Sequence, residues 1–103
     1  FGPVTSVIRV ESIEEAIRLA NQTVYGLSAA VLGRNVGLAM EVASQLEAGM
    51  VHINNATVMD DPMTAFGGIK ASGFGREGGH YSIDALTDYK WITFQRMIGA
   101  FPM

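Results

Sequence analysis

The chain has 103 residues, of which 49% are hydrophobic and 17% charged, with a net charge of −3 and no cysteine. One domain of this length holds enough apolar residues for its own core, which excludes a disordered tail. The absence of cysteine excludes a thiolate nucleophile and a cysteine-ligated metal site within this chain. The mildly acidic balance argues against nucleic acid as a partner, and no run approaches the roughly 20 apolar residues of a membrane span, so we expect a soluble, cytoplasmic protein.

The first third of the chain predicts a strand that leads into a helix. β-Branched residues make up much of the segment 4–10, and Ser12 with Glu15 has the spacing of a capping box that begins a helix. The helix should bury one apolar face on a sheet. The residues of that face are Ile13, Ala16, Ile17 and Ala20.

The alternation continues as far as residue 54. We expect a buried strand at 27–32, a second helix at 36–46 with Gly49 as its left-handed cap, and a third strand at 50–54. This order indicates an α/β fold with a mostly parallel sheet and flanking helices.

Periodicity stops between residues 55 and 79, where six of the 12 glycines lie between Gly67 and Gly79. A loop of this length inside a compact domain is either functional or disordered, and Phe66, Ile69 and Phe74 offer apolar anchors. We therefore expect an ordered, functional loop.

Two elements are expected after this loop. Residues 80–88 predict a short helix. The segment that begins at Lys90 and ends at Gln95 alternates like a strand, and its apolar faces require a partner edge.

Residues 73–78 match the pattern G-x-G-x-x-G, which is shared by dinucleotide-binding folds. The pattern carries that meaning only after a strand and with an acidic residue about 20 positions later, where this chain has Thr93. We therefore interpret these glycines as allowing tight backbone packing. His52 is expected to be a core histidine with its hydrogen bonds satisfied and His80 a surface residue, and neither has the spacing of a metal site.

Four segments in order resemble the C-terminal portion of the NAD(P)-dependent aldehyde dehydrogenase superfamily. They are residues 1–4 (FGPV), 25–27 (YGL), 66–73 (FGGIKASG) and 75–77 (GRE). The resemblance implies that residues 1–89 are the last part of a catalytic α/β domain and that residues 90–103 are an oligomerisation strand and tail. The nucleophilic cysteine, the general base and the dinucleotide fold would then lie upstream, so the isolated chain is expected to be inactive.

The resemblance also implies roles for individual residues. Phe1 matches an aromatic residue that borders the nicotinamide ring of NAD or NADP, with a plain core phenylalanine as the alternative. Asn55 and Thr57 match orienting polar groups, and Met59 and Phe66 apolar groups, on the wall of the substrate tunnel.

Glu77 matches a glutamate on the proton path to the general base, and an interface ion pair with Arg76 is the alternative. The run 52–58 (HINNATV) looks most like the branch that oxidises aromatic aldehydes such as salicylaldehyde, benzaldehyde or vanillin.

The function implied is that of a fragment of an oxidoreductase, which oxidises an aldehyde to a carboxylic acid with NAD or NADP through a cysteine thiohemiacetal. This chain would supply part of the tunnel wall and, from Lys90 to Gln95, a strand for homo-oligomerisation. The alternatives are a non-enzymatic strand-pairing module and a stand-alone nucleotide binder that uses residues 73–78.

Overall fold

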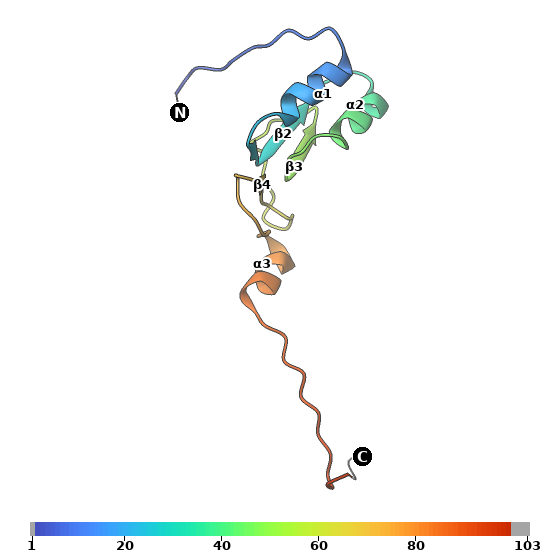
Figure 1. Cartoon of the computed structure of the whole chain (residues 1–103), viewed down its shortest axis with the longest axis vertical. Coiled ribbons are helices and arrows are strands. Elements are labelled where there is room, and N and C mark those ends of the chain that lie inside the picture. Colours follow the sequence, from blue (N-terminus) through green and yellow to red (C-terminus); the bar gives the residue numbers. More distant parts are fainter. Residues whose placement is uncertain (1, 100–103) are drawn as a thin grey trace.

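The structure, a computed structural model, describes residues 2–99 (Figure 1). Its helices are α1 (Ile13–Asn21), α2 (Val36–Ala43) and α3 (Gly79–Leu86). Its strands are β1 (Tyr25–Gly26), β2 (Ser28–Val31), β3 (Met50–Ile53) and β4 (Ile69–Lys70). No helix in this part of the chain is long and apolar enough to cross a membrane.

The strands form two small sheets of two strands each. Strands β2 and β3 are parallel, with Ser28 opposite Met50, whereas β1 and β4 are antiparallel, with Tyr25 opposite Lys70. The predicted α/β class and the strands at 27–32 and 50–54 are confirmed in shortened form, but the described residues form no large parallel sheet. The expected strands at 4–10 and 90–95 are absent because neither segment has a hydrogen-bonded neighbour within residues 2–99.

Helix α1 begins at the predicted capping box. The Ser12 hydroxyl accepts the Glu15 N–H at 3.1 Å, and the Glu15 carboxylate accepts the N–H of Glu11 at 3.0 Å. A hydrogen bond from the backbone N–H of Glu14, together with one from the Ser12 hydroxyl, lowers the pKa of the Glu14 carboxyl. The helix therefore begins with its first amides satisfied by side chains.

Helix α2 connects the two parallel strands and packs on both of them. The Asn35 side chain accepts the Leu38 N–H at 3.1 Å at its start, and Ser44, in a right-handed conformation, ends it. The prediction that Gly49 provides a left-handed cap is therefore wrong. Gly49 instead lies so close to the Gly67 carbonyl that a side chain at position 49 would overlap it.

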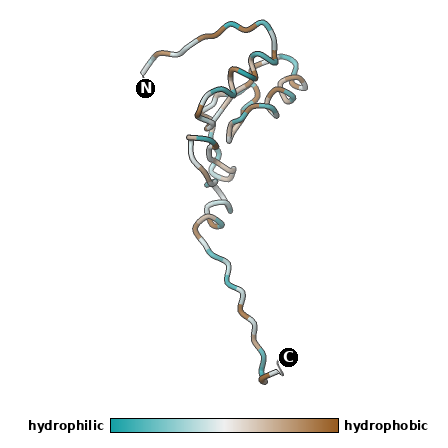
Figure 2. The backbone as a smooth tube through the Cα atoms, viewed as in Figure 1, coloured by the Kyte–Doolittle hydropathy of each residue, from teal (hydrophilic) through white to brown (hydrophobic). Residues whose placement is uncertain are grey.

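The chain does not close a hydrophobic core of its own, contrary to the expectation from its composition. Ala39 is the one buried apolar side chain among the described residues. The accessible surface is 9140 Å², against about 5,600 Å² for a compact monomer of this mass. The apolar face of α1 is only half-covered, with Ile13 39% exposed. Figure 2 shows hydrophobic residues spread along the whole tube.

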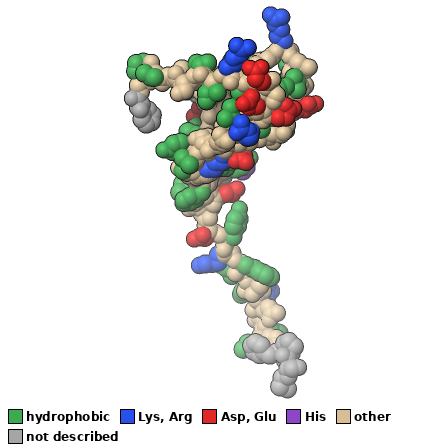
Figure 3. Space-filling view, turned by 45° about the horizontal axis from the view of Figure 1, so that its top comes forward, with side chains coloured by type: hydrophobic (Ala, Val, Ile, Leu, Met, Phe, Trp, Pro, Cys, Tyr) green, Lys and Arg blue, Asp and Glu red, His purple; other side chains and the backbone are tan. Residues whose placement is uncertain are grey.

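The molecule is elongated, with extents of 73 × 31 × 26 Å. Helices α1 and α2 lie beside β2 and β3 at one end, α3 follows below, and the C-terminal segment continues away from it (Figure 1). Hydrophobic side chains protrude along both extended ends (Figure 3). The large apolar side chains exposed there are Val4, Val7, Ile8, Tyr89, Trp91, Ile92, Phe94, Met97 and Ile98.

Candidate functional site

The residues that sequence reasoning assigned to a tunnel wall and to a proton path lie on two loops. The first loop follows β3 and carries residues 55–59. The second surrounds β4 and carries Phe66 and Glu77. Phe1 lies outside the described residues.

The first loop begins at Asn54, whose φ of 54° is in the left-handed region that asparagine tolerates. Its side-chain amide pairs with the backbone of Gly33, which follows β2. The Asn54 Oδ1 accepts the Gly33 N–H at 2.8 Å, and the Asn54 Nδ2 donates to the Gly33 carbonyl at 3.0 Å. The end of β2 is thereby joined to the start of the loop.

The predicted tunnel residues of this loop present exposed side chains. Met59 is 50% exposed, and Asn55 and Thr57 are also exposed. Local hydrogen bonds shape the loop, with the Ala56 N–H donated to the Asn55 side chain at 2.9 Å. The Thr57 carbonyl accepts a 2.8 Å hydrogen bond from the Ser28 hydroxyl at the start of β2.

The second loop closes on itself through a pair of backbone hydrogen bonds. Phe66 and Glu77 each donate an N–H to the other's carbonyl at 2.8 Å. Both residues line a cavity of about 410 Å³ between this loop and α3, together with Leu27, Phe74, Arg76 and Leu86. The structure thus brings Phe66 and Glu77 together, while the residues of the first loop lie outside this cavity wall.

The Glu77 side chain is exposed, and the described residues place no ion pair between it and Arg76. The half-buried Arg76 guanidinium instead donates to the carbonyls of Gly68, at 2.9 Å, and Gly75, at 2.7 Å. Arg76 therefore shapes the loop, and Glu77 lines the cavity without an ion pair to Arg76 in the described part of the chain.

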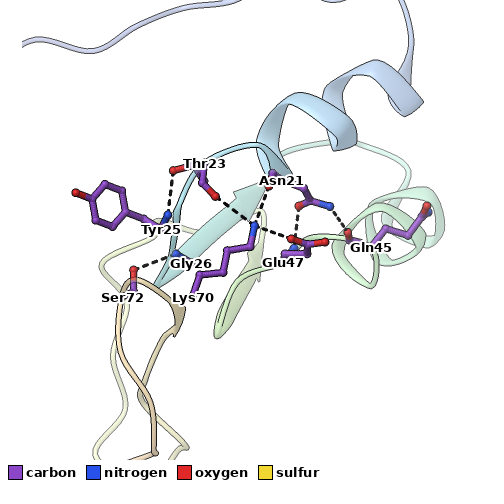
Figure 4. A network of polar contacts seen from close by, with 8 residues as sticks. All are labelled: Asn21, Thr23, Tyr25, Gly26, Gln45, Glu47, Lys70 and Ser72. Carbon is purple, nitrogen blue, oxygen red and sulfur yellow. Dashed lines mark hydrogen bonds and ion pairs between the residues drawn. The ribbon is translucent and has the colours of Figure 1, made fainter.

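A polar network centred on Lys70 attaches the second loop to the rest of the molecule (Figure 4). The Lys70 ammonium lies 2.6 Å from the Glu47 carboxylate and donates to the carbonyls of Asn21, at 2.8 Å, and Thr23, at 3.3 Å. These carbonyls lie at the C-terminal end of α1, where the helix dipole favours a cation.

The Asn21 side chain extends the network. It accepts the Glu47 N–H at 2.9 Å and donates to the Gln45 carbonyl at 2.8 Å. Nearby, the Ser72 hydroxyl accepts the Gly26 N–H at 2.9 Å. Sequence reasoning missed this network, because Lys70 and Asn21 are 49 positions apart and no local spacing relates them.

The described residues do not form a cradle for a dinucleotide. Residues 73–78 lie between the antiparallel strand β4 and helix α3, whereas the fingerprint requires a parallel βαβ unit. Gly78, with φ of 100°, lies where a side chain would overlap the Thr64 carbonyl, as tight backbone packing requires. No cluster of three metal-binding side chains is found between residues 2 and 99.

His52 departs from expectation. It lies on β3, but its Nε2 is buried and has no hydrogen-bond partner among the described residues. The prediction of a satisfied core histidine is therefore wrong for this chain taken alone, since such a nitrogen is costly to bury without a partner. His80 is exposed as expected.

The family model for the aldehyde dehydrogenase family matches residues 1–92. The chain therefore belongs to the aldehyde dehydrogenase family, as its four motifs indicated. It spans about a fifth of the length of the curated relatives it matches.

Particular relatives refine this similarity. Salicylaldehyde dehydrogenase from Pseudomonas putida G7, crystallised with salicylaldehyde, is 44% identical, with a TM-score of 0.92, over 100% of this chain and 21% of its own. Vanillin dehydrogenase from Pseudomonas sp. strain HR199 is 46% identical over 92% of this chain and 20% of its own length. An aldehyde dehydrogenase from Mycobacterium tuberculosis, crystallised with NAD+, is 37% identical, with a TM-score of 0.77, over 82% of this chain and 17% of its own.

Proposed function

We propose that this chain works as part of an NAD(P)-dependent enzyme that oxidises an aromatic aldehyde to a carboxylic acid. The observation that carries the proposal is the similarity of the whole chain to the salicylaldehyde dehydrogenase crystallised with its aldehyde. The chain has no cysteine, so a thiolate nucleophile must come from outside it. This chain supplies part of the wall of the substrate tunnel and a strand of the subunit interface.

The two loops are the proposed wall of the substrate tunnel. Met59 and Phe66 provide apolar surface for an aromatic ring, and Asn55 and Thr57 provide polar groups that orient the aldehyde. The similarity to salicylaldehyde and vanillin dehydrogenases supports an aromatic substrate.

Glu77 is the proposed member of a proton path. Glu77 is exposed and lines the cavity beside Phe66, and the proposal requires water there to exchange protons with its carboxylate. Relatives crystallised with NAD+ support a nicotinamide cofactor. In the proposal another part of the enzyme holds it chiefly, and Phe1 is the aromatic residue that would border the nicotinamide.

The segment from Lys90 to Gln95 is the proposed homo-oligomerisation strand. Trp91 and Phe94 are 91% and 83% exposed, and the segment has no strand partner within residues 2–99. Addition to an edge strand of another subunit would satisfy its backbone and cover its apolar side chains.

A chimera tests the proposal directly. This chain replaces the matching fifth of the Pseudomonas putida salicylaldehyde dehydrogenase, and NADH formation is followed with salicylaldehyde. We expect NAD-dependent oxidation by the chimera and none by the 103-residue chain alone.

The matched control is the same chimera with its upstream nucleophilic cysteine replaced by alanine, which should be inactive. A folded, oligomeric chimera that oxidises no aldehyde would contradict the enzymatic proposal and favour a strand-pairing module. NAD binding by the 103-residue chain in titration calorimetry would instead favour a stand-alone nucleotide binder.

A further inference from the structure

The loop at residues 55–59 presents its side chains to solvent, and the hydrogen bond that the Asn55 side chain accepts from the Ala56 N–H stays within the loop, so it does not attach the loop to the rest of the molecule. Val58 is 85% exposed and Met59 50%. What holds the loop is hydrogen bonding of its backbone and of the residue before it. The source of those bonds therefore determines where the proposed tunnel wall lies.

Two side chains outside the proposed wall hold this loop. The Ser28 hydroxyl donates to the Thr57 carbonyl at 2.8 Å. Within the described residues, no other donor reaches that carbonyl. The Asn54 amide holds the entry of the loop against Gly33 through two hydrogen bonds.

Both attachments begin from regular structure. Ser28 is the first residue of β2, where it lies opposite Met50 of the parallel strand β3. Asn54 comes directly after β3, and its N–H continues the strand pairing by donating to the Val31 carbonyl at 2.9 Å. The paired strands thus form a fixed base, and the two polar side chains transmit its position to the loop.

We propose that Ser28 and Asn54 are positioning residues, which act through the loop at 55–59 to set how Thr57 and Met59 meet the aldehyde. The inference rests on the proposed function, since it assigns the loop a substrate to face. Neither residue touches the substrate. The hydrogen bond to the Thr57 carbonyl restricts rotation of the peptide group between Thr57 and Val58, so the backbone that carries the neighbouring side chains keeps its position.

The test uses the chimera with salicylaldehyde and NAD+ as the varied substrates. Loss of one hydrogen bond predicts that Ser28→Ala raises the KM for salicylaldehyde about three- to tenfold, with the KM for NAD+ unchanged and kcat within about twofold. Ser28→Thr keeps the hydroxyl and suits a strand, so it should restore the parent KM. Asn54→Gly keeps the left-handed backbone but loses both amide bonds, and should raise the same KM further.

Ser44→Ala is the matched control. The Ser44 hydroxyl also donates to a backbone carbonyl, that of Glu41, at 2.8 Å, but it lies at the end of α2 away from the loop. This variant should leave both KM values unchanged. An unchanged aldehyde KM in Ser28→Ala, an equal rise in the KM for NAD+, or failure of Ser28→Thr to restore the KM would each overturn the inference.

A second measurement separates this inference from the proposed function. Hydrogen exchange of amides 56–59, measured in the chimera, should be faster in Ser28→Ala than in the parent or in Ser44→Ala, whether or not the chimera oxidises an aldehyde. Equal exchange in all three proteins would refute the attachment itself. An inactive parent chimera with faster exchange in Ser28→Ala would leave the attachment standing and count against the proposed function.

Discussion

The middle of the chain and its two ends contrast in how they are held. Between residues 13 and 78, residues far apart in sequence bond to one another, as the Lys70 ammonium does to the Asn21 carbonyl and the Glu47 carboxylate. Residues 2–10 and 90–99 carry large exposed apolar side chains and make no hydrogen bond or ion pair to residues 13–78 within the described chain. Polar bonds thus join distant parts of the middle, whereas the two ends expose apolar side chains that such bonds do not tie to it.

The largest effect is expected at the C-terminal end. Trp91→Lys combined with Phe94→Lys should abolish the oligomer of the chimera, because each buried aromatic side chain contributes about 1.5–3 kcal/mol to an interface. Light scattering after size-exclusion chromatography measures the mass. Asp88→Lys, which changes the net charge by the same two units outside the segment from Lys90 to Gln95 and removes no apolar group, should leave the mass unchanged. An unchanged mass in the double variant would show that this end is covered by something other than a second subunit.

Within the middle, Gly49→Ala should have the strongest effect. The added methyl group would overlap the Gly67 carbonyl, so the two backbones must separate at a cost of about 3 kcal/mol. Hydrogen exchange of the β2 and β3 amides in the chimera reports the loss of protection. Gly33→Ala meets open space and is the control. Equal protection in both variants would mean that the backbone segments at Gly49 and Gly67 separate without cost.

Lys70→Met tests the polar network. We expect a loss of about 1–2 kcal/mol in the opening free energy of β1 and β4, less than for a buried charge because the Glu47 side chain is 55% exposed. Hydrogen exchange at Ala71, whose N–H donates to the Val24 carbonyl, measures it. Lys90→Met removes the same charge from the unpaired end and should change nothing. A similar change in Ala71 exchange in both variants would contradict the difference between the middle of the chain and its ends.

The smallest effect is expected where the middle meets the N-terminal end. Ser12→Ala removes the cap of α1 and should cost about 1 kcal/mol of local stability. Amide exchange in the first turn of α1 is the measurement. Ser6→Ala, in the unpaired segment, should have no effect. If α1 exchanges equally in both variants, the boundary of the ordered middle lies further along the chain.

Sequence predicted those elements that depend on nearby residues. The capping box at Ser12 uses residues three positions apart, and β2, α2 and β3 follow from apolar periodicity. The segments at 4–10 and 90–95 have the composition of strands, but a strand also requires a partner, which composition does not supply. The pairing of Phe66 with Glu77 and the contacts of Lys70 arise from tertiary structure. The motifs therefore indicated which loops belong to the site, but not which contacts hold those loops in place.

The parallel pair has a consequence for how the chain acquires its structure. Only residues 32–49 separate β2 from β3, and α2 occupies much of that interval. Closing so short a loop costs little entropy, whereas joining β1 to β4 must close one more than twice as long. The unit β2–α2–β3 is therefore suited to nucleate folding during synthesis, before the glycine-rich segment leaves the ribosome.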